Sequence, residues 1–406
     1  MSRVYLDHAA SSPLRPEVLA AMEPWLTEGF GNANALYWEG KQARQALDNA
    51  RSSIAASINA NPTEIVFTSG GTESNNALIA GITQAVRTKK GRDKGGNHIV
   101  SSAFEHHAVL EPIQALKRVG YEVTLVKPTR EGFIPPEAFS VALRPDTMFA
   151  SIIMAQNELG TIQPIAELAH VAHANGTLLH SDAVQALGKI ALDISQLGID
   201  AASFSAHKIG GPKGIGAFYL KSRTPFAATQ LGGGQEAARR SGTQNVAGAV
   251  GFAKALELAA SEREQEAQRL TGLRDRLAAG LLALDSRISL TVECVGDSVP
   301  QTDTQVGQGG KPSGDKHSDR YLPSMLSLLV TGYESETLIL KLDDAGFAVS
   351  GGSACSTGSL EPSHVLMSLG LTRNQAYGAL RISLGRENTN EDIESFLSTF
   401  KKILNS

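Results

Sequence analysis

Short hydrophobic runs alternate with amphipathic stretches through most of the chain. The short runs are rich in β-branched and aromatic residues and end at turn residues, so they predict strands. The predicted strands are 65–68, 98–103, 122–126, 148–154, 177–180, 201–204, 216–220, 322–329, 347–349 and 381–384. Apolar residues at helical spacing predict helices at 16–25, 41–58, from about 70 to 86, from 107, from 165, at 246–284, at 335–342 and from 390. This alternation predicts an α/β fold with a mostly parallel sheet covered by helices.

The chain of 406 residues is longer than a domain built on a single hydrophobic core usually is, so we expect two domains. We expect the larger domain to span 16–258, and the smaller one to combine 1–15 with 259–406. The charged part of the long helix, 261–276, should lead from one to the other. Residues 297–319 are polar and rich in Gly, Pro and Ser, which predicts a mobile surface insertion.

The charge balance argues against a dedicated surface for nucleic acid or anionic membrane. The chain carries 37 basic and 41 acidic residues, a net charge of -4. No apolar run approaches the length of a membrane span, and the fold pattern begins at Tyr5, so we expect no targeting segment and a cytoplasmic protein. Two cysteines cannot form a disulfide framework, so both should be free thiols. A small-molecule enzyme fits these totals best.

Polar residues follow several predicted strands at their carboxyl ends, where ligands collect in α/β folds. They are Glu105-His106, Gln156-Asn157-Glu158, Asp182 with Gln185, and Ser205 to Lys208. In addition, the segment 69–75 joins a strand to a helix through Gly70 and Gly71, and the unpaired N–H groups of such a helix start attract anions. A simple helix cap at Thr72 explains that segment equally well.

Lys208 stands at a strand end before a glycine-rich turn, which suits a lysine that forms a Schiff base with pyridoxal phosphate. Taken alone, it is better explained as a solvated lysine. The other strand ends each meet a need of the same cofactor: Asp182 can keep the pyridine nitrogen protonated, Gln185 can donate to the ring hydroxyl, and His106 can stack on the ring. The phosphate would be held by Thr72, Ser205 and His207. Taken singly, each residue can be explained without a cofactor: His106 as a core histidine, Asp182 as a helix cap and Gln185 as a surface side chain.

The two cysteines have different surroundings. Cys355 lies in a loop of small residues, 350–358, where a thiol is accessible and can move as a nucleophile must. Cys294 lies within an apolar, strand-like pattern at 289–295, which predicts a packed structural thiol.

Together these motifs resemble the group I cysteine desulfurases of the NifS/IscS type, within the class V aminotransferase-like enzymes. The resemblance covers nearly the whole chain. It rests on Tyr5-Leu6-Asp7-His8-Ala9-Ala10, Thr68-Ser69-Gly70-Gly71-Thr72-Glu73-Ser74, Glu105-His106, Asn157-Glu158-Leu159-Gly160, Asp182-Ala183-Val184-Gln185, Ser205-Ala206-His207-Lys208, Arg240-Ser241-Gly242-Thr243, Ser353-Ala354-Cys355 and Arg381-Ile382-Ser383-Leu384-Gly385-Arg386.

The resemblance implies the fold of the aspartate aminotransferase-like pyridoxal phosphate enzymes, with a large domain and a small α/β C-terminal domain. It implies Lys208 as the internal aldimine, Asp182 at the pyridine nitrogen, Gln185 at the ring oxygen and His106 stacked on the ring. Gly71 would join Thr72 at the phosphate. Asn157 would lie near cofactor and substrate, and Arg381 would bind the substrate carboxylate as a bidentate pair. The threonine matching Thr243 reaches the phosphate of a neighbouring subunit in this family, which implies a homodimer.

The implied reaction removes sulfur from L-cysteine. Lys208 would move the α-proton, Cys355 would take the sulfur as a persulfide, and His106 would carry a proton, leaving L-alanine. An iron–sulfur scaffold or a tRNA-thiolating enzyme would accept the sulfur. The sequence departs from the family at 33–38, where Pro-Ser-Ser and a following histidine are missing and Tyr37 receives no role.

Other functions remain open from the residues. A selenocysteine lyase or a class V aminotransferase would have the same fold, and a non-catalytic scaffold could keep it. A nucleotide-binding protein is disfavoured, since none of the three Gly-Lys pairs precedes Ser or Thr. A zinc site on His170 and His173 lacks further ligands.

Overall fold

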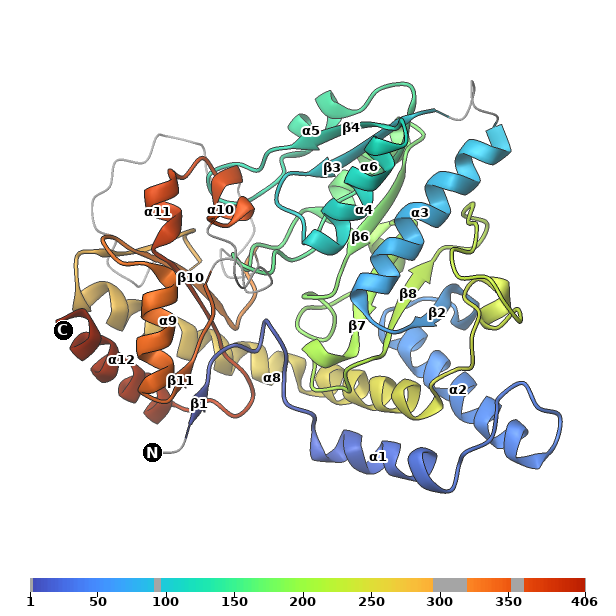
Figure 1. Ribbon diagram of the computed structural model, residues 1–406, viewed down its shortest axis with the longest axis horizontal. Coiled ribbons are helices and arrows are strands. Elements are labelled where there is room, and N and C mark those ends of the chain that lie inside the picture. Colours follow the sequence, from blue (N-terminus) through green and yellow to red (C-terminus); the bar gives the residue numbers. More distant parts are fainter. Residues whose placement is uncertain (1–2, 91–95, 295–319, 352–360, 406) are drawn as a thin grey trace.

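The computed structural model describes residues 3–90, 96–294, 320–351 and 361–405. Its main feature is a seven-stranded sheet in the order β2-β8-β7-β6-β5-β3-β4 (Figure 1). The strands are β2 (Ile65–Thr68), β3 (His98–Ser102), β4 (Glu122–Val126), β5 (Thr147–Ser151), β6 (Leu178–Asp182), β7 (Ala201–Ser205) and β8 (Gly216–Leu220). Only β8 runs against its neighbours, so the other six strands share one direction. The prediction of a mostly parallel sheet is confirmed.

Helices cover both faces of this sheet. One face packs against α3 (Gly71–Lys90) and α4 (His107–Arg118), whose apolar residues form a separate core cluster. The other face carries α2 (Trp38–Ser57), α5 (Pro136–Ala142), α6 (Ile165–Ala174), α7 (Ile194–Leu197) and the first part of α8 (Val246–Leu284), and α1 (Pro16–Thr27) packs on α8. Coverage of both faces explains why the strands other than the edge strand β4 are almost wholly buried rather than alternating.

A smaller body contains two further sheets. One is antiparallel, with β12 (Ala379–Ser383), β10 (Met325–Val330) and β9 (Ile288–Leu290) in that order, and the other pairs β1 (Val4–Tyr5) with β11 (Phe347–Ala348). Its helices are α9 (Ser335–Asp344), α10 (His364–Ser368), α11 (Arg373–Tyr377) and α12 (Asn390–Leu404). The long helix α8 runs from the large sheet into this body (Figure 1). The chain thus begins in the small body and crosses to the large one after β1.

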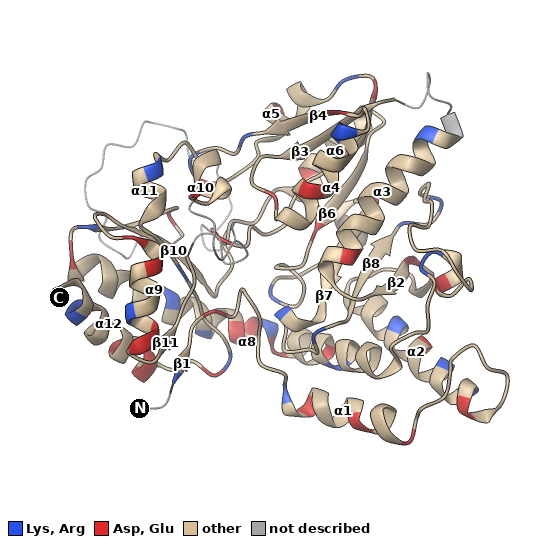
Figure 2. Cartoon of the chain, viewed as in Figure 1, with Lys and Arg blue, Asp and Glu red and all other residues tan. Residues whose placement is uncertain are grey.

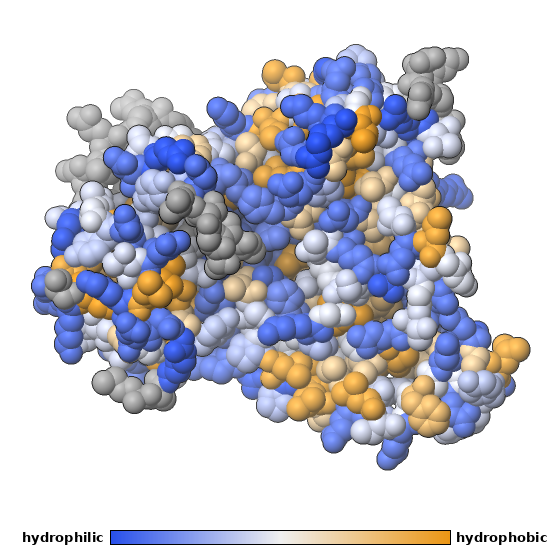
Figure 3. Space-filling view, in the orientation of Figure 1, coloured by the Kyte–Doolittle hydropathy of each residue, from blue (hydrophilic) through white to orange (hydrophobic). Residues whose placement is uncertain are grey.

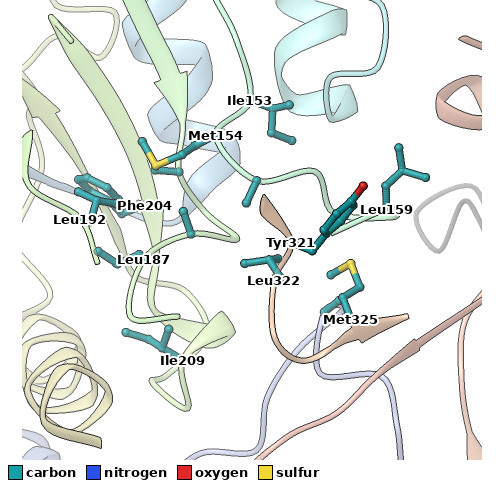
Figure 4. Packing of buried hydrophobic residues seen from close by; sticks show 14 of the residues in the cluster. Ile153, Met154, Leu159, Leu187, Leu192, Phe204, Ile209, Tyr321, Leu322 and Met325 are labelled. Atoms are coloured by element: carbon teal, nitrogen blue, oxygen red, sulfur yellow. The ribbon is translucent and has the colours of Figure 1, made fainter. Parts of the chain in front are cut away.

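Apolar packing joins the two bodies beside the loop that follows β5. Leu159 of that loop lies next to Tyr321, Leu322 and Met325 (Figure 4). The loop is also tied by backbone hydrogen bonds, from Ile162 N to the carbonyl of Arg320 and from Leu322 N to the carbonyl of Gly160. These contacts hold the loop that carries Asn157 in a fixed place between the two bodies.

Most element boundaries agree with the pattern of the sequence, and the exceptions have physical reasons. The predicted strand 322–329 starts only at Met325, because Pro323 has no N–H to give to a ladder. Ser335 is the first residue of α9 and not its cap, which is Glu334. Cys294 lies beyond the end of β9, so the predicted strand around it is wrong, although the thiol is buried as expected. The predicted insertion at 297–319 lies outside the described residues.

The remaining differences are small shifts. The predicted strand 148–154 ends at Ser151, the helix 41–58 begins at Trp38, and the strand 381–384 begins at Ala379. Basic and acidic residues are interspersed over the molecule (Figure 2). Within the described ranges, no helix is long and apolar enough to cross a membrane.

Candidate active site

The carboxyl ends of the parallel strands gather the predicted site residues at one edge of the large sheet. Gly216 of β8 pairs with Thr68 of β2 on one side and with Ser205 of β7 on the other, so these two strand ends are close. Asp182 of β6 pairs with Ser203 of β7. A Cβ on Gly216 would lie 2.6 Å from the Cα of Gly70, so a glycine there allows the close approach of the two turns.

Lys208 ends a short 3₁₀ turn, η2 (Ala206–Lys208), directly after β7. Its amine donates hydrogen bonds to the carbonyls of Ala9 at 2.6 Å and Ala10 at 2.7 Å. Nδ1 of His207 is hydrogen-bonded to Oγ of Ser11 at 3.2 Å. Burial, with the nearby charge of Lys208, lowers the pKa of His207 to about 4, so this ring is neutral at pH 7. The N-terminal segment 9–11 therefore covers the lysine.

Asp182 ends β6 and is buried, with 4% of its surface exposed. Its Oδ2 accepts a hydrogen bond from the side chain of Asn75 at 2.7 Å, and its Oδ1 accepts one from the backbone N–H of Val184 at 3.0 Å. Two fixed donors thus set the orientation of the carboxylate. A cationic ring N–H at this strand end would meet an oriented acceptor.

Gln185 follows Asp182 on a helical turn and is also buried. Its Nε2 donates to the carbonyl of Ala9 at 2.8 Å, and its Oε1 accepts from the amine of Lys189 at 2.6 Å. The carbonyl of Ala9 therefore receives hydrogen bonds from both Gln185 and Lys208.

His106 precedes α4 as its N-cap, and its Nδ1 accepts the backbone N–H of Ala108 at 3.0 Å. A backbone N–H only donates, so Nδ1 carries no proton and a neutral ring holds its proton on Nε2. Burial lowers the pKa of His106, Asp182 acts in the opposite direction, and Lys208 lowers it further. His106 is therefore a neutral imidazole whose electrostatic neighbours are the two central site residues.

Arg381 lies in β12 of the small body and reaches toward the loop after β5. Its guanidinium donates to the backbone carbonyl of Asn157 and to Oδ1 of Asp7, both at 2.8 Å, and only 3% of it is exposed. The second oxygen of Asp7 accepts the hydroxyl of Ser350 at 2.7 Å. Nε of Arg381 has no acceptor among the described residues. This arginine is charged, oriented and not fully satisfied, as a carboxylate-binding group should be.

The start of helix α3, which follows β2, lies at the same sheet edge. The backbone N–H groups of Gly71 and Thr72 have no acceptor within the described part of the chain. Thr72 is the second residue of α3, which rules out the alternative that it is the helix cap. A Cβ on Gly71 would lie 2.7 Å from Cγ2 of Val184, so the turn packs closely beside the strand end that carries Asp182. Glu73 is held away by an ion pair with Arg240 at 2.7 Å.

Two buried glutamates, Glu105 and Glu158, are the sequence neighbours of His106 and Asn157. Glu105, next to His106, accepts the hydroxyl of Ser102 and the backbone N–H of Ile153 through Oε1. Glu158, next to Asn157, accepts the hydroxyl of Ser363 at 2.6 Å. Burial raises the pKa of each carboxyl to about 8. Both are therefore protonated at pH 7.

Thr243 and Cys355 are the two predicted residues that remain. Thr243 is exposed in the loop before α8, beside Gln244, whose side chain is 3.5 Å from that of Asn34. Cys355 lies outside the described residues. Tyr37, which the sequence left without a role, is 62% exposed.

Sequence reasoning missed three contributors. Asn75, Lys189 and Asp7 each bind a predicted site residue through one hydrogen bond or ion pair. The spacing of Lys189 four residues after Gln185 was a usable signal, because a helical turn places such residues on one side. Asp7 gave no such signal, since its partner lies 374 residues away.

The residues present fit pyridoxal phosphate. The start of α3 offers unpaired N–H groups for a phosphate, Asp182 offers an oriented acceptor for the ring nitrogen, and Lys208 offers the amine for the aldehyde. All three lie at ends of β2, β6 and β7, which are brought together by the register described above.

Known proteins resemble the chain over almost its full length. It matches the aminotransferase class-V family over residues 4–296 and 314–396. It is 43% identical to the cysteine desulfurase IscS of Dictyoglomus turgidum over 99% of this chain and 94% of that protein. The IscS of Methanosarcina thermophila is 41% identical over 99% of this chain and 92% of the relative.

Solved structures agree. A NifS-like protein is similar with a TM-score of 0.87 at 33% identity, covering 99% of both chains. DndA from Streptomyces lividans is similar with a TM-score of 0.72 at 35% identity, covering 94% of this chain and 99% of the other. The alternatives of a selenocysteine lyase or an aminotransferase are not favoured by these relatives. The chain therefore belongs to the aminotransferase class-V family and, within it, to the cysteine desulfurases of the NifS/IscS type.

Proposed function

We propose that this enzyme uses pyridoxal phosphate to remove sulfur from L-cysteine, giving L-alanine and a persulfide on Cys355. The observation that carries the proposal is the meeting of Lys208, Asp182 and the start of α3 at one sheet edge, with Arg381 reaching in from the small body. The identity of 40 to 43% to proteins named as cysteine desulfurases supports the same activity.

The cofactor would be held by residues with distinct tasks. Gly71, Thr72, Ser205 and His207 would bind its phosphate, and Asp182 would pair with the ring nitrogen. Gln185 would donate to the ring oxygen, and His106 would stack on the ring beside Asn157. When bound, the cofactor draws electrons away from the α-carbon of the substrate.

The chain's own residues would handle substrate and protons. Arg381 would bind the substrate carboxylate through its remaining N–H groups, since Asn157 and Asp7 occupy only two of them. The amine of Lys208 would take the α-proton of the substrate. His106, neutral with its proton on Nε2, can give that proton up and take another, as a proton carrier must.

The sulfur would leave through Cys355. Its thiolate attacks the sulfur of the substrate, an S–S bond forms, and the C–S bond of the substrate breaks with its electron pair going to carbon. Protonation of that carbon completes L-alanine. One cysteine and one thiol thus become one alanine and one persulfide, with no added oxidant.

We also propose a homodimer. Helix α1 and the loop after it expose large apolar side chains, and hydrophobic residues gather over α1 in the space-filling view (Figure 3). These exposed residues are Leu19, Leu26, Phe30, Leu36 and Tyr37, and Trp38 at the start of α2 continues the surface. The contact between Asn34 and Gln244 places this surface beside Thr243. A second copy covering it would bring Thr243 toward the partner's phosphate.

The proposal extends to organisation and partners. The larger domain would span 16–258 and the smaller one 1–15 with 259–406, so the boundary would fall inside α8. The protein would act in the cytoplasm, where its two thiols stay reduced. It would pass sulfur to an iron–sulfur scaffold or to an enzyme that thiolates tRNA.

The decisive experiment compares Cys355→Ala with the matched control Cys294→Ala. With pyridoxal phosphate and L-cysteine, the first variant should keep the visible absorbance of the cofactor but form no persulfide and release no alanine. The control should form the persulfide and release alanine as the wild type does, because Cys294 is buried and burial raises its pKa to about 11. Alanine release by Cys355→Ala at the wild-type rate would refute the assignment. A purified protein that takes up no cofactor would refute the proposed function as a whole.

A further inference from the structure

We propose that Lys189 is a positioning residue that fixes the amide of Gln185, so that its NH₂ group faces the cofactor ring. This inference rests on the proposed function, because it concerns the ring oxygen of pyridoxal phosphate. Lys189 lies on the turn after β6, four residues after Gln185. Its amine donates a hydrogen bond to Oε1 of Gln185 at 2.6 Å.

The two hydrogen bonds of Gln185 leave its amide only one orientation. The carbonyl of Ala9 can only accept, so the end of the amide 2.8 Å from it must be the NH₂ group. With the NH₂ end committed to Ala9, the end that faces the amine of Lys189 is the oxygen, which accepts from that amine. A flipped amide would place two acceptors against each other at Ala9, and it would set an amide N–H against the amine of Lys189 whenever that amine is charged.

This orientation decides what Gln185 can offer a ligand. A primary amide has two N–H groups, and one is used by Ala9. The second remains for an acceptor such as a deprotonated ring oxygen. The carbonyl of Ala9 also receives the amine of Lys208 at 2.6 Å, so Gln185 and Lys208 converge on the same point. Lys189 thus acts on the ring oxygen through Gln185.

The surroundings of Lys189 make its charge depend on pH near neutrality. Burial, with the charges of Lys208 and Arg381, lowers the pKa of Lys189 to about 7. The side chain also lines a cavity of about 140 Å³ between the N-terminal segment, α8 and the small body, together with His8 and Lys208. The charged residues across this cavity are Arg15, Glu262, Arg263, Glu266, Arg386 and Glu387. Three arginines and three glutamates are thus present there, and the charges that act on the pKa of Lys189 are those of Lys208 and Arg381.

The test titrates the visible absorbance of the holoenzyme with pH. That absorbance follows the proton shared between the ring oxygen and the lysine-bound end of the cofactor. In Lys189→Met the amide of Gln185 keeps only its hydrogen bond to Ala9 and is held less firmly toward the ring oxygen, and a nearby positive charge is lost. Both changes make the proton bind more tightly. The midpoint should rise by about 0.5 to 1 pH unit. The matched control is Lys221→Met, since Lys221 is exposed and pairs only loosely with Asp200 at 3.9 Å.

A double-mutant cycle separates positioning from charge. In a Gln185→Ala background no amide remains to be oriented, so Lys189→Met should move the midpoint by less than half of its effect in the wild type. Equal effects in the two backgrounds, or no effect in either, would overturn the inference. The melting temperature of each holoenzyme is recorded beside the titration, and a shifted midpoint with unchanged melting temperature supports positioning over general unfolding. A wild-type protein without a cofactor band would instead refute the proposed function.

Discussion

The buried carboxyl of Glu158 makes stability depend on pH, and Glu158→Gln should remove part of that dependence. Glu158 is 4% exposed, and its Oε2 accepts the hydroxyl of Ser363 at 2.6 Å. The same serine oxygen accepts the backbone N–H groups of Val365 and Leu366, so its single proton goes to Glu158. Glutamine keeps an oxygen acceptor at this place and is neutral at every pH.

The magnitude follows from linkage. Burial raises the pKa of Glu158 from 4.5 to about 8, with the Ser363 hydrogen bond and the charge of Arg381 acting in the opposite direction. Between these two values the folded state binds a proton that the unfolded state has lost, so the free energy of unfolding falls as pH rises and levels off above about pH 8. One pKa unit is about 1.4 kcal/mol, so the loss between about pH 6 and pH 9 is about 3 kcal/mol at most.

The assay measures urea unfolding at a series of pH values for wild type and Glu158→Gln. The variant should match the wild type within about 1 kcal/mol near pH 6 and exceed it by about 3 kcal/mol near pH 9. Glu105, whose pKa is also raised, is present in both proteins and drops out of the difference. The matched control is Glu264→Gln, an exposed glutamate on α8. Parallel curves for wild type and variant would refute the argument, because Glu158 would then be ionised in the fold at pH 6.

Three further outcomes are expected. Gly216→Ala should destabilise the protein by about 1 to 3 kcal/mol in thermal unfolding, because its Cβ would lie 2.5 Å from the carbonyl of Phe204, and wild-type stability would show that the strands can separate there. Arg51→Ala should cost about 3 kcal/mol in the same measurement, since it leaves the buried Glu236 without its bidentate partner, and a loss below about 1 kcal/mol would contradict this. Cys294 should resist alkylation in the native protein at pH 8 and react after denaturation, as mass spectrometry can follow; native labelling would show that it is accessible.

The sequence predicted those elements whose boundaries are set locally. The strands 65–68, 122–126 and 216–220 and the helix 246–284 agree with the structure residue for residue, because turn residues or caps flank them. Short helices without a long amphipathic pattern, such as α10 and α11, were not predicted. Ser363 and His364 tie α10 to the large body, and α11 packs on α10 and β10; a local pattern does not reveal such tertiary contacts.

The site divides in the same way. The rule that parallel strands end at one edge was enough to bring Lys208, Asp182 and His106 together. The partners that orient them could not be found by that rule, because Asp7 and Arg381 meet only when β1 and β12 have joined the small body. Cys355 lies outside the described residues, so its place in the site stays a prediction.

The N-terminal segment 7–11 is the element on which both bodies and the site converge. It leaves β1 in the small body, where Asp7 holds Arg381, and then gives the carbonyl of Ala9 to Lys208 and to Gln185. In the proposed function, Lys208 would give up its hydrogen bonds to this segment when it binds the cofactor, whereas the hydrogen bond from Gln185 would not need to change. Gln185, held in turn by Lys189, would then keep Ala9 in place while the lysine moves. On the proposed function, the hydrogen bond from Gln185 would therefore keep the segment ordered while Lys208 is released from it and returns.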